Sequence, residues 1–275
     1  MENISWYPGH MKKTRELIQE NLKLVDVVCE LLDSRIPYSS RNPIIGELVK
    51  NKIRIVILNK SDLAEEENTK KWAEKLRQEG SRVLIMNAES GEGAAALRSL
   101  LAKIRDERNE DRQRKKPLRL MIVGIPNVGK SSLINRLTGK KGAKTGNMPG
   151  VTRGKQWLLL GEDIMLLDTP GILWPKFEDQ ELAKKLAFCG AIRDEIMDLA
   201  TLGLELIACL SRIAPDLLIA RYKLDRLEET PLQTMEAIAA KRGFILPGKR
   251  IDYERTARTV IDEFRAGTIG RISLE

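Results

Sequence analysis

The sequence predicts an α/β fold in which a three-layer domain with a phosphate-binding loop, residues 1–176, precedes a small all-α domain, residues 177–275. Strand and helix patterns alternate through the first hundred residues, which favours a parallel sheet covered by helices on both faces. The segment Gly124–Ser132, GIPNVGKSS, lies between a strand pattern and a helix pattern. From about Phe177 onward the apolar spacing is helical throughout.

Within the first hundred residues, apolar runs of strand length alternate with apolar positions at helical spacing. The predicted strands are residues 25–34, 53–60 and 81–88. The predicted helices are residues 44–51, 61–80 and 93–108. The charged stretch 109–117, NEDRQRKKP, follows these elements and is typical of a linker.

The second half of the first domain surrounds the GIPNVGKSS segment. A buried strand is predicted at 118–124 and a helix at 131–139, which ends at a glycine. The Gly- and Lys-rich residues 140–154 predict a mobile loop. The apolar runs 155–161 and 163–171 then predict a hairpin of two strands.

Composition narrows the class of protein. The net charge of +8 and the isoelectric point of about 9.3 favour a polyanionic partner. No run of about 18 apolar residues is present, so we expect no membrane span. The N-terminus lacks the layout of a secretion signal. Cys29, Cys189 and Cys209 lie in apolar surroundings without paired spacing, which is typical of buried thiols in a cytoplasmic protein.

The GIPNVGKSS segment matches the phosphate-loop pattern G-x-x-x-x-G-K-[ST] at Gly124, Gly129, Lys130 and Ser131. In such a loop, backbone N–H groups at the start of a helix surround phosphate oxygens. Lys130 is expected to reach the outer phosphates and assist catalysis, and Ser131 to offer its hydroxyl to Mg²⁺. The remaining predicted contacts of the loop are Asn127, Val128, Gly129 and Ser132. A chance match in a tight turn is the alternative.

A second motif, Asn59-Lys60-Ser61-Asp62, ends a predicted strand and resembles the N-K-x-D element of GTPases. Asp62 is expected to accept both N–H groups on the guanine edge, while Asn59 supports the base and Lys60 lays its aliphatic stem on the ring. Adenine would leave the Asp62 carboxylate unpaired, at about 2–5 kcal/mol. An ordinary turn at a strand end is the alternative.

Two further strand ends complete the predicted site. Asp168 begins the sequence Asp-Thr-Pro-Gly, where its carboxylate is expected to hold the hydration shell of Mg²⁺ and the N–H of Gly171 to sense the terminal phosphate. The backbone N–H groups of Asn87 and Ala88 are expected near guanine O6. Each signal is weak alone, because turns at strand ends commonly contain these residue types.

The order of the motifs indicates a circular permutation. Asn59–Asp62 precedes the phosphate loop, whereas ordinary GTPases have the reverse order, and residues 109–117 would form the join. Together the segments WYPGHM, DSRIPYSSRNP, GIPNVGKSS, PGVTRGKQW and DTPGILWP resemble the YlqF/RbgA family of ribosome biogenesis GTPases A. The fold implied is a circularly permuted P-loop GTPase domain followed by a helical, RNA-binding domain similar to the ANTAR fold.

The resemblance also implies a function. Members bind GTP and GDP, act in late maturation of the large ribosomal subunit, contact its rRNA and hydrolyse GTP faster on that particle. We therefore expect a slow intrinsic GTPase that acts as a monomer in the cytoplasm, without a membrane partner. A GTPase that gates an RNA-modifying partner and a GTP-dependent scaffold with negligible hydrolysis are the alternatives.

Hydrolysis needs a group that orients water. Many GTPases use a glutamine just after the D-x-x-G motif, but Ile172 stands there. The resemblance implies that His10, the sole histidine of the chain, replaces it. The alternative is a packing or RNA-contact role for His10.

The loops around the phosphates contain two further candidates. In GTPases with a P-N-V-G-K-S loop, the asparagine, here Asn127, helps to hold a K⁺ ion; its alternative role is to shape the turn. Thr152, in PGVTRG, is expected to close on Mg²⁺ and the terminal phosphate when GTP is bound. A loop threonine without that role is the alternative.

Basic residues mark two expected RNA contacts. One set surrounds the Gly- and Lys-rich loop 140–154, which is the expected switch loop, and continues at the join. Apart from Lys130, this set comprises Arg112, Arg114, Lys115, Lys116, Arg119, Arg136, Lys140, Lys141, Lys144, Arg153 and Lys155. In the helical domain, Arg255, Arg258 and Arg265 flank an apolar helix face. A solvated charged surface is the alternative for both.

Overall fold

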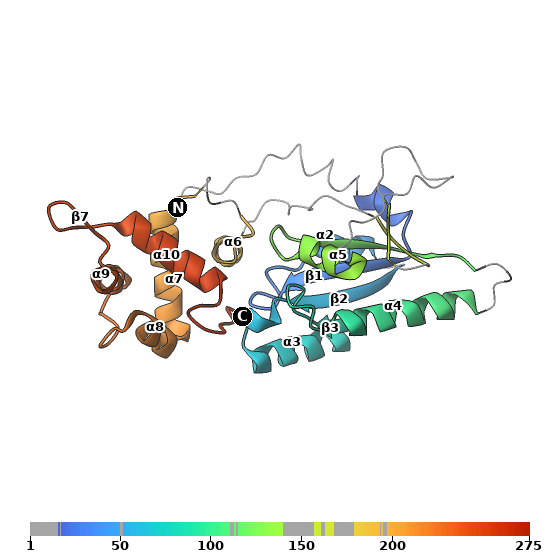
Figure 1. Cartoon of the computed structure of the whole chain (residues 1–275), viewed down its shortest axis with the longest axis horizontal. Helices are drawn as coiled ribbons and strands as arrows, with labels where there is room; N and C mark the ends of the chain where they lie inside the picture. The colour runs from blue at the N-terminus through green and yellow to red at the C-terminus, as the bar shows by residue number, and fades with distance from the viewer. Residues whose placement is uncertain are drawn as a thin grey trace. The chain divides into compact units, whose positions relative to one another are not determined.

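The computed structural model of the chain (Figure 1) describes residues 16, 18–49, 52–110, 113, 115–139, 157–160, 163–167, 179–192, 194 and 197–275. The chain divides into two compact units. Described residues up to 61 and from 66 to 167 form the first unit, and residues 62–65 and those from 179 onward form the second.

Among the described residues, six strands of the first unit form one sheet in the order β3-β2-β1-β4-β6-β5. Their bounds are β1 (Val27–Asp33), β2 (Ile53–Asn59), β3 (Arg82–Ile85), β4 (Leu118–Gly124), β5 (Trp157–Leu159) and β6 (Ile164–Leu167). All neighbours are parallel except β5, which pairs with β6 in antiparallel register. The predicted parallel sheet and the predicted hairpin pairing are therefore confirmed.

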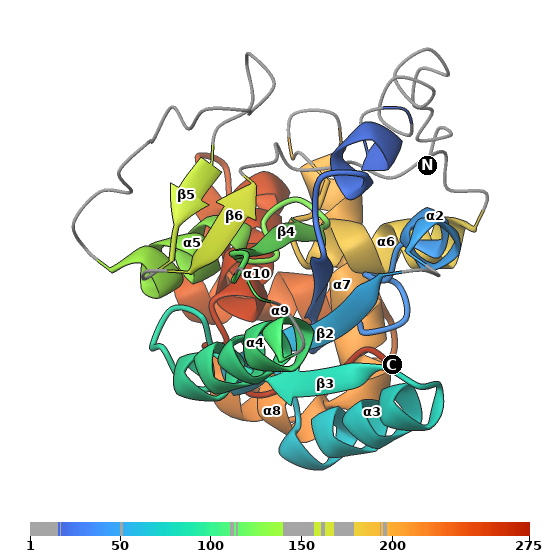
Figure 2. The same cartoon turned by 90° about the vertical axis from the view of Figure 1, so that its right-hand side faces the viewer.

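Helices cover both faces of the sheet, as Figure 2 shows: α4 and α5 lie on one side, α2 and α3 on the other. Their bounds are α2 (Pro43–Leu48), α3 (Glu66–Gln78), α4 (Ala94–Asn109) and α5 (Lys130–Thr138). Every residue of β1 is buried, because a central parallel strand is covered on both faces. On α4, Leu97, Leu101 and Ile104 recur at helical spacing and are buried, so they form its sheet-facing side.

The strand predicted at 81–88 is shorter in the structure, where β3 ends at Ile85. The chain turns around Asn87, whose Oδ1 accepts hydrogen bonds from Glu89 N at 3.0 Å and Ser90 N at 3.1 Å. Asparagine favours such turns because its side chain replaces a backbone acceptor. The boundary was misjudged because the apolar run continues to Met86 and Ala88, both of which are buried after the strand has ended.

The order of the strands determines where a ligand binds. From β1 the chain proceeds outward to β2 and β3, and then returns so that β4 pairs with the other side of β1. In open parallel sheets, ligands bind beside the carboxyl ends of the strands where the order reverses. The carboxyl ends of β1 and β4, at Asp33 and Gly124, lie at that point.

The second unit is built mainly from five helices among the described residues. They are α6 (Gln180–Phe188), α7 (Leu199–Ile213), α8 (Pro215–Tyr222), α9 (Pro231–Arg242) and α10 (Tyr253–Arg265). The apolar face expected on α10 is confirmed, since Ala257, Val260, Ile261 and Phe264 are buried. It packs against α7, where the Cβ of Ala257 approaches Gly203 so closely that a side chain on Gly203 would collide with it.

Among the residues that the structure describes, the expectation that this region is helical throughout is wrong at one place. Strands β7 (Ile245–Leu246) and β8 (Arg250–Ile251) form an antiparallel hairpin between α9 and α10. Pro247, Gly248 and Lys249 connect them, and Pro-Gly is a dipeptide typical of turns. Each strand has only two residues, too few for a period-two pattern to be recognised.

Residues 62–65 belong to the second unit through the C-terminal segment. Ile272 N donates to Leu63 O at 3.0 Å, and Glu65 N donates to Ser273 Oγ at 3.2 Å. No described helix has the length and apolar character that crossing a membrane requires. None of the three cysteines forms a disulfide bond; Cys29 and Cys189 are buried as expected, whereas Cys209 is partly exposed.

Candidate nucleotide-binding site

The phosphate loop connects β4 to α5 at the carboxyl edge of the sheet. Strand β4 ends at Gly124, where a Cβ would lie 2.7 Å from the Leu31 carbonyl oxygen, so only glycine allows the two strands to approach. Asn127 and Gly129 adopt positive φ angles of 57° and 102°. Helix α5 begins at Lys130, so its free N–H groups face the loop, an arrangement suited to anions.

Gly129 is required for two reasons. Its φ of 102° is one that L side chains rarely adopt, and a Cβ at this position would collide with the Asn59 side-chain amide. The pattern G-x-x-x-x-G-K-[ST] predicts a glycine here, but the collision partner comes from a different motif. The absence of a side chain at Gly129 therefore allows the phosphate loop to lie against Asn59 of the second motif.

Lys130 places its charge among backbone carbonyls of the same loop. Its Nζ donates to Gly124 O at 3.0 Å and to Ile125 O at 2.6 Å. Burial lowers the pKa of the Lys130 ammonium to about 8. A partly desolvated ammonium surrounded by carbonyls gains strongly from an added anion, since phosphate oxygens supply the opposite charge.

Asn59 joins three segments that are distant in the sequence. Its Nδ2 donates to Val128 O in the phosphate loop at 2.7 Å, and its Oδ1 accepts from Ala88 N at 2.9 Å. The side chain is buried, with an exposed fraction of 3% for the residue. The structure therefore brings together the carboxyl end of β2, the phosphate loop and the turn after β3.

The turn after β3 supports Asn59 in the structure. The N–H of Ala88 donates to Asn59, and the N–H of Asn87 donates to Glu92 O at 3.2 Å. The expected contact of these two N–H groups with guanine O6 stays a prediction. Ala88 and Ser132 also line a pocket of about 890 Å³, within the size range of small-ligand sites.

The remaining residues of the second motif follow directly after β2. Lys60 has a positive φ of 59°, and its Nζ lies 3.3 Å from Asp33 Oδ2. Ser61 N donates to Met86 O at 3.2 Å, and Asp62 lies in the short helix η1 (Ser61–Leu63). Asp33 is absent from the residues predicted for the site, although a carboxylate at the carboxyl end of a strand was a signal for it.

Of the residues predicted to hold Mg²⁺, only Ser131 lies among those that the structure describes. Ser131 is exposed in the first turn of α5, next to Lys130, and a hydroxyl oxygen there suits a hard cation such as Mg²⁺. The predicted residues His10, Thr152, Asp168 and Gly171 lie outside the described residues. Their roles stay predictions.

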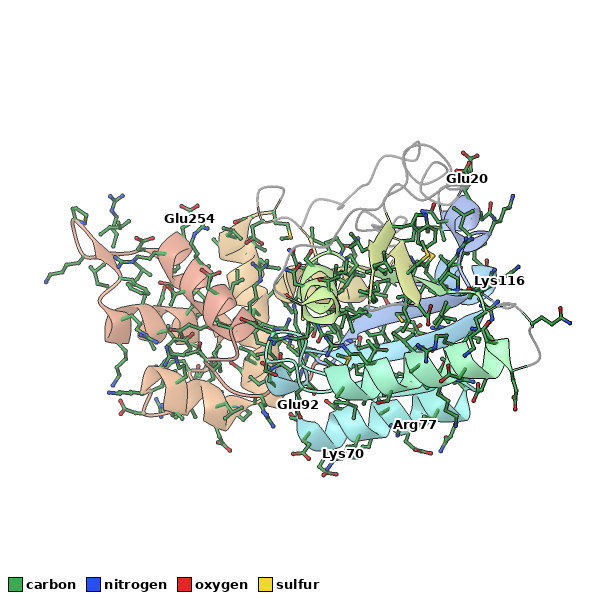
Figure 3. The ribbon with its side chains drawn as sticks, turned by 45° about the vertical axis from the view of Figure 1, so that its right-hand side comes forward. Glu20, Lys70, Arg77, Glu92, Lys116 and Glu254 are labelled. Atoms are coloured by element: carbon green, nitrogen blue, oxygen red, sulfur yellow. The ribbon has the colours of Figure 1, made fainter. Side chains whose placement is uncertain are left out.

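Figure 3 labels Glu92 and Lys116 near opposite ends of α4. Glu92 belongs to the turn that starts with Asn87, at the carboxyl edge of the sheet. Lys116 lies at the opposite edge and lines a second pocket of about 440 Å³ with Arg105, Arg108 and Arg119. The candidate nucleotide site and this basic pocket therefore occupy opposite edges.

Comparison with known proteins agrees with the geometry. A family model described as 50S ribosome-binding GTPase matches residues 119–232. A ribosome biogenesis GTPase A from Bacillus cereus is 44% identical over 276 residues, 99% of this chain and 93% of that protein. A protein of the same name from Priestia megaterium is 45% identical over 278 residues, 99% of this chain and 96% of that protein. The solved GNP-bound YlqF from T. maritima superimposes with a TM-score of 0.70 at 32% identity, over 96% of this chain and 97% of that one.

Proposed function

The chain belongs to the ribosome biogenesis GTPase A (YlqF/RbgA) family and is a GTP-hydrolysing ribosome assembly factor, and from this premise we propose that it binds the large ribosomal subunit or its precursor and promotes late maturation. The Asn59 amide carries the nucleotide-binding part of the proposal, because it joins the base-recognition motif, Asn59–Asp62, to the phosphate loop. Neither alternative, a GTPase that gates a modifying enzyme or a scaffold with negligible hydrolysis, has an observation in its favour.

We propose the following roles within the site. Asp62 receives the guanine edge, Lys60 covers the ring, and Asn59 and Ser61 hold the motif in place. The backbone N–H groups of the phosphate loop and Lys130 bind the phosphates. Ser131, with Thr152 and Asp168, holds Mg²⁺, which would neutralise phosphate charge. Gly171 senses the terminal phosphate.

The test is GTP turnover titrated with mature and with immature large subunits. We expect immature particles to stimulate the full-length wild type, and His10→Ala to bind GTP normally while losing most of the stimulation. The reason is that Ile172 cannot orient water, so the particle must bring another group into place. No stimulation of the wild type would contradict the proposed function. Equal stimulation of His10→Ala would contradict only the role of His10.

A K⁺ ion beside Asn127 is the second proposed cofactor. Asn127 lies in the phosphate loop with a positive φ, a position from which its side-chain oxygen could face the phosphates. We expect hydrolysis in K⁺ to exceed hydrolysis in Na⁺ at equal ionic strength, and Asn127→Ala to remove the difference. Equal rates of the wild type in the two salts would exclude the ion.

The rRNA contact is proposed for the join and the switch region. Arg105, Arg108, Lys116 and Arg119 line the basic pocket, with Asp26 as its acidic member, bonded to Arg108 at 2.6 Å. Such a surface fits a phosphate backbone. We further propose that the protein acts as a monomer in the cytoplasm.

A further inference from the structure

The loop that follows β1, Asp33–Asn42, belongs to the segment DSRIPYSSRNP, and nothing above gives it a role. It is unusual because its polar residues are buried; these are Asp33, Ser34, Arg35, Ser39, Ser40 and Asn42. Surface loops normally leave such groups in water, since burial of polar groups is unfavourable unless they are hydrogen-bonded. The partners of these groups therefore indicate what the loop supports.

Asp33 is the centre of the loop. Its Oδ1 accepts from Arg35 N at 3.1 Å and from Arg35 Nε at 2.9 Å, and its Oδ2 accepts from Arg35 Nη2 at 2.8 Å. Asp33 N donates to Ser40 Oγ at 3.0 Å, which closes the loop. Both side chains of the ion pair are 1% exposed. The two-point contact fixes the plane of the carboxylate.

The fixed carboxylate points to the base-recognition motif. Asp33 Oδ2 lies 3.3 Å from Lys60 Nζ, and Ser34 N donates to Asn59 O at 2.9 Å. The Lys60 backbone has a φ of 59°, which is unfavourable for a residue other than glycine and persists where surrounding contacts impose it. The β1 loop thus contacts the motif through its backbone and through the Lys60 ammonium.

We propose that Asp33 is a positioning residue for guanine recognition, which holds Lys60 in the conformation that receives the base. The inference rests on the proposed placement of guanine at Lys60. A lysine side chain held before binding loses less conformational entropy when the ligand arrives, so the ion pair contributes affinity without touching the nucleotide. Burial would raise the pKa of Asp33, but the charge and hydrogen bonds of Arg35, with the charge of Lys60, lower it to about 2, so the carboxylate stays ionised.

A purely structural ion pair is the competing explanation, and the same strand offers a matched control. Glu30 is also buried on β1, and its Oε2 accepts from Arg54 Nε on β2 at 2.9 Å. Arg54 lies near the start of β2, away from the carboxyl edge where Lys60 lies. Glu30 Oε1 also accepts from Asn42 N at 3.1 Å at the end of the loop. The carbonyl oxygen of glutamine can still accept this hydrogen bond, so Glu30→Gln removes a buried carboxylate charge from the same strand while the loop and the Lys60 contact stay.

The experiment uses full-length protein and measures the dissociation constants of GDP and ADP by competition with a fluorescent GDP analogue. The variants are Asp33→Asn, Lys60→Met, their combination, and Glu30→Gln. We expect Asp33→Asn and Lys60→Met each to weaken GDP binding about tenfold, and the double variant to bind no more weakly than Lys60→Met. Glu30→Gln should stay within about twofold of wild type even if its melting temperature falls as far as that of Asp33→Asn.

Additive losses in the double variant, or unchanged GDP affinity in Asp33→Asn, would overturn the inference. Asp33→Asn leaves the Arg35 charge buried without its partner and can prevent folding. In that case Asp33→Asn with Arg35→Gln removes both charges, and the same loss and the same non-additivity with Lys60→Met are expected. A wild type that binds ADP as well as GDP would contradict the guanine site itself, which separates the two failures.

Discussion

At the scale of single residues, the pKa of Lys130 predicts a pH dependence of nucleotide binding. Burial lowers this pKa to about 8, and only the ammonium form attracts phosphate. Above pH 8 the free protein increasingly carries the neutral amine, so binding must take up a proton and affinity must fall. Calorimetry at pH 8.5 in two buffers of different ionisation enthalpy should show this uptake, and the same pair of buffers at pH 6.5 should not. Affinity that is constant from pH 7 to 9 would contradict it.

Several residues of the site could be predicted from the sequence because their chemistry is local. Gly124, Gly129 and Lys130 lie within one short motif, and the structure shows why each glycine is needed. The link from Asn59 to Val128 depends on two strands that are not neighbours in the sequence. The strand-end position of Asp33 was a signal for the site, but its contact with Lys60 depends on β1 lying beside β2, which no local pattern contains.

At the scale of elements, one arginine has a different role from the one expected. Arg265 was predicted on a basic flank of α10, but its guanidinium donates to Phe188 O at 3.1 Å and Ala187 O at 2.8 Å at the C-terminal end of α6. It also bonds to Asp194, with Nη1 to Oδ2 at 2.8 Å. Arg265 of α10 therefore caps the C-terminal end of α6, and it is not available for the RNA contact expected on the basic flank of α10.

We expect Arg265→Ala to lower the free energy of unfolding of the helical unit by about 1.5–3 kcal/mol, because carbonyl groups at a helix end lose a charged donor. Arg258→Ala is the matched control: Arg258 is exposed on the same helix, and its loss should change stability by less than about 0.5 kcal/mol. Urea denaturation followed by circular dichroism measures both. Equal stabilities of the two variants would exclude the capping role.

Helices and strands could be predicted where a regular pattern of apolar residues extends over many positions. Strand β1 is buried at all seven residues and α4 has a clear apolar side, so both were recognised. The hairpin β7–β8 was missed because its apolar residues Ile245 and Leu246 are exposed, at 46% and 40%, and do not alternate with a buried face. Local turn chemistry at Pro247-Gly248 was its one signal.

At the scale of the whole molecule, the net charge of +8 predicts salt-dependent binding to ribosomal particles. Lys116 is exposed in the basic pocket, and we expect Lys116→Gln to weaken binding and to reduce the slope of log affinity against log salt by about 1. Lys70→Gln is the control, because that exposed lysine pairs with Glu66 at 2.8 Å on another helix. The measurement is the affinity of each variant for immature large subunits, determined by co-sedimentation at a series of salt concentrations from low to moderate. Identical slopes for the two variants would contradict a phosphate contact at Lys116.

The permuted architecture could be predicted from motif order alone, since the base-recognition motif comes before the phosphate loop. The grouping of residues 62–65 with the second unit could not, because it depends on contacts with Ile272 and Ser273, some two hundred residues later. Contacts over such separations follow from tertiary packing and leave no periodic signal in the chain.

The position of β4 between β1 and β6 has a consequence for biosynthesis. While the polypeptide is being translated, β1, β2 and β3 emerge first, and the side of β1 that later receives β4 has no partner. An open strand edge invites wrong pairing with other chains. The nascent protein can therefore shield that edge only after Leu118–Gly124 has left the exit tunnel, and the same docking step is the one that first creates a place for nucleotide.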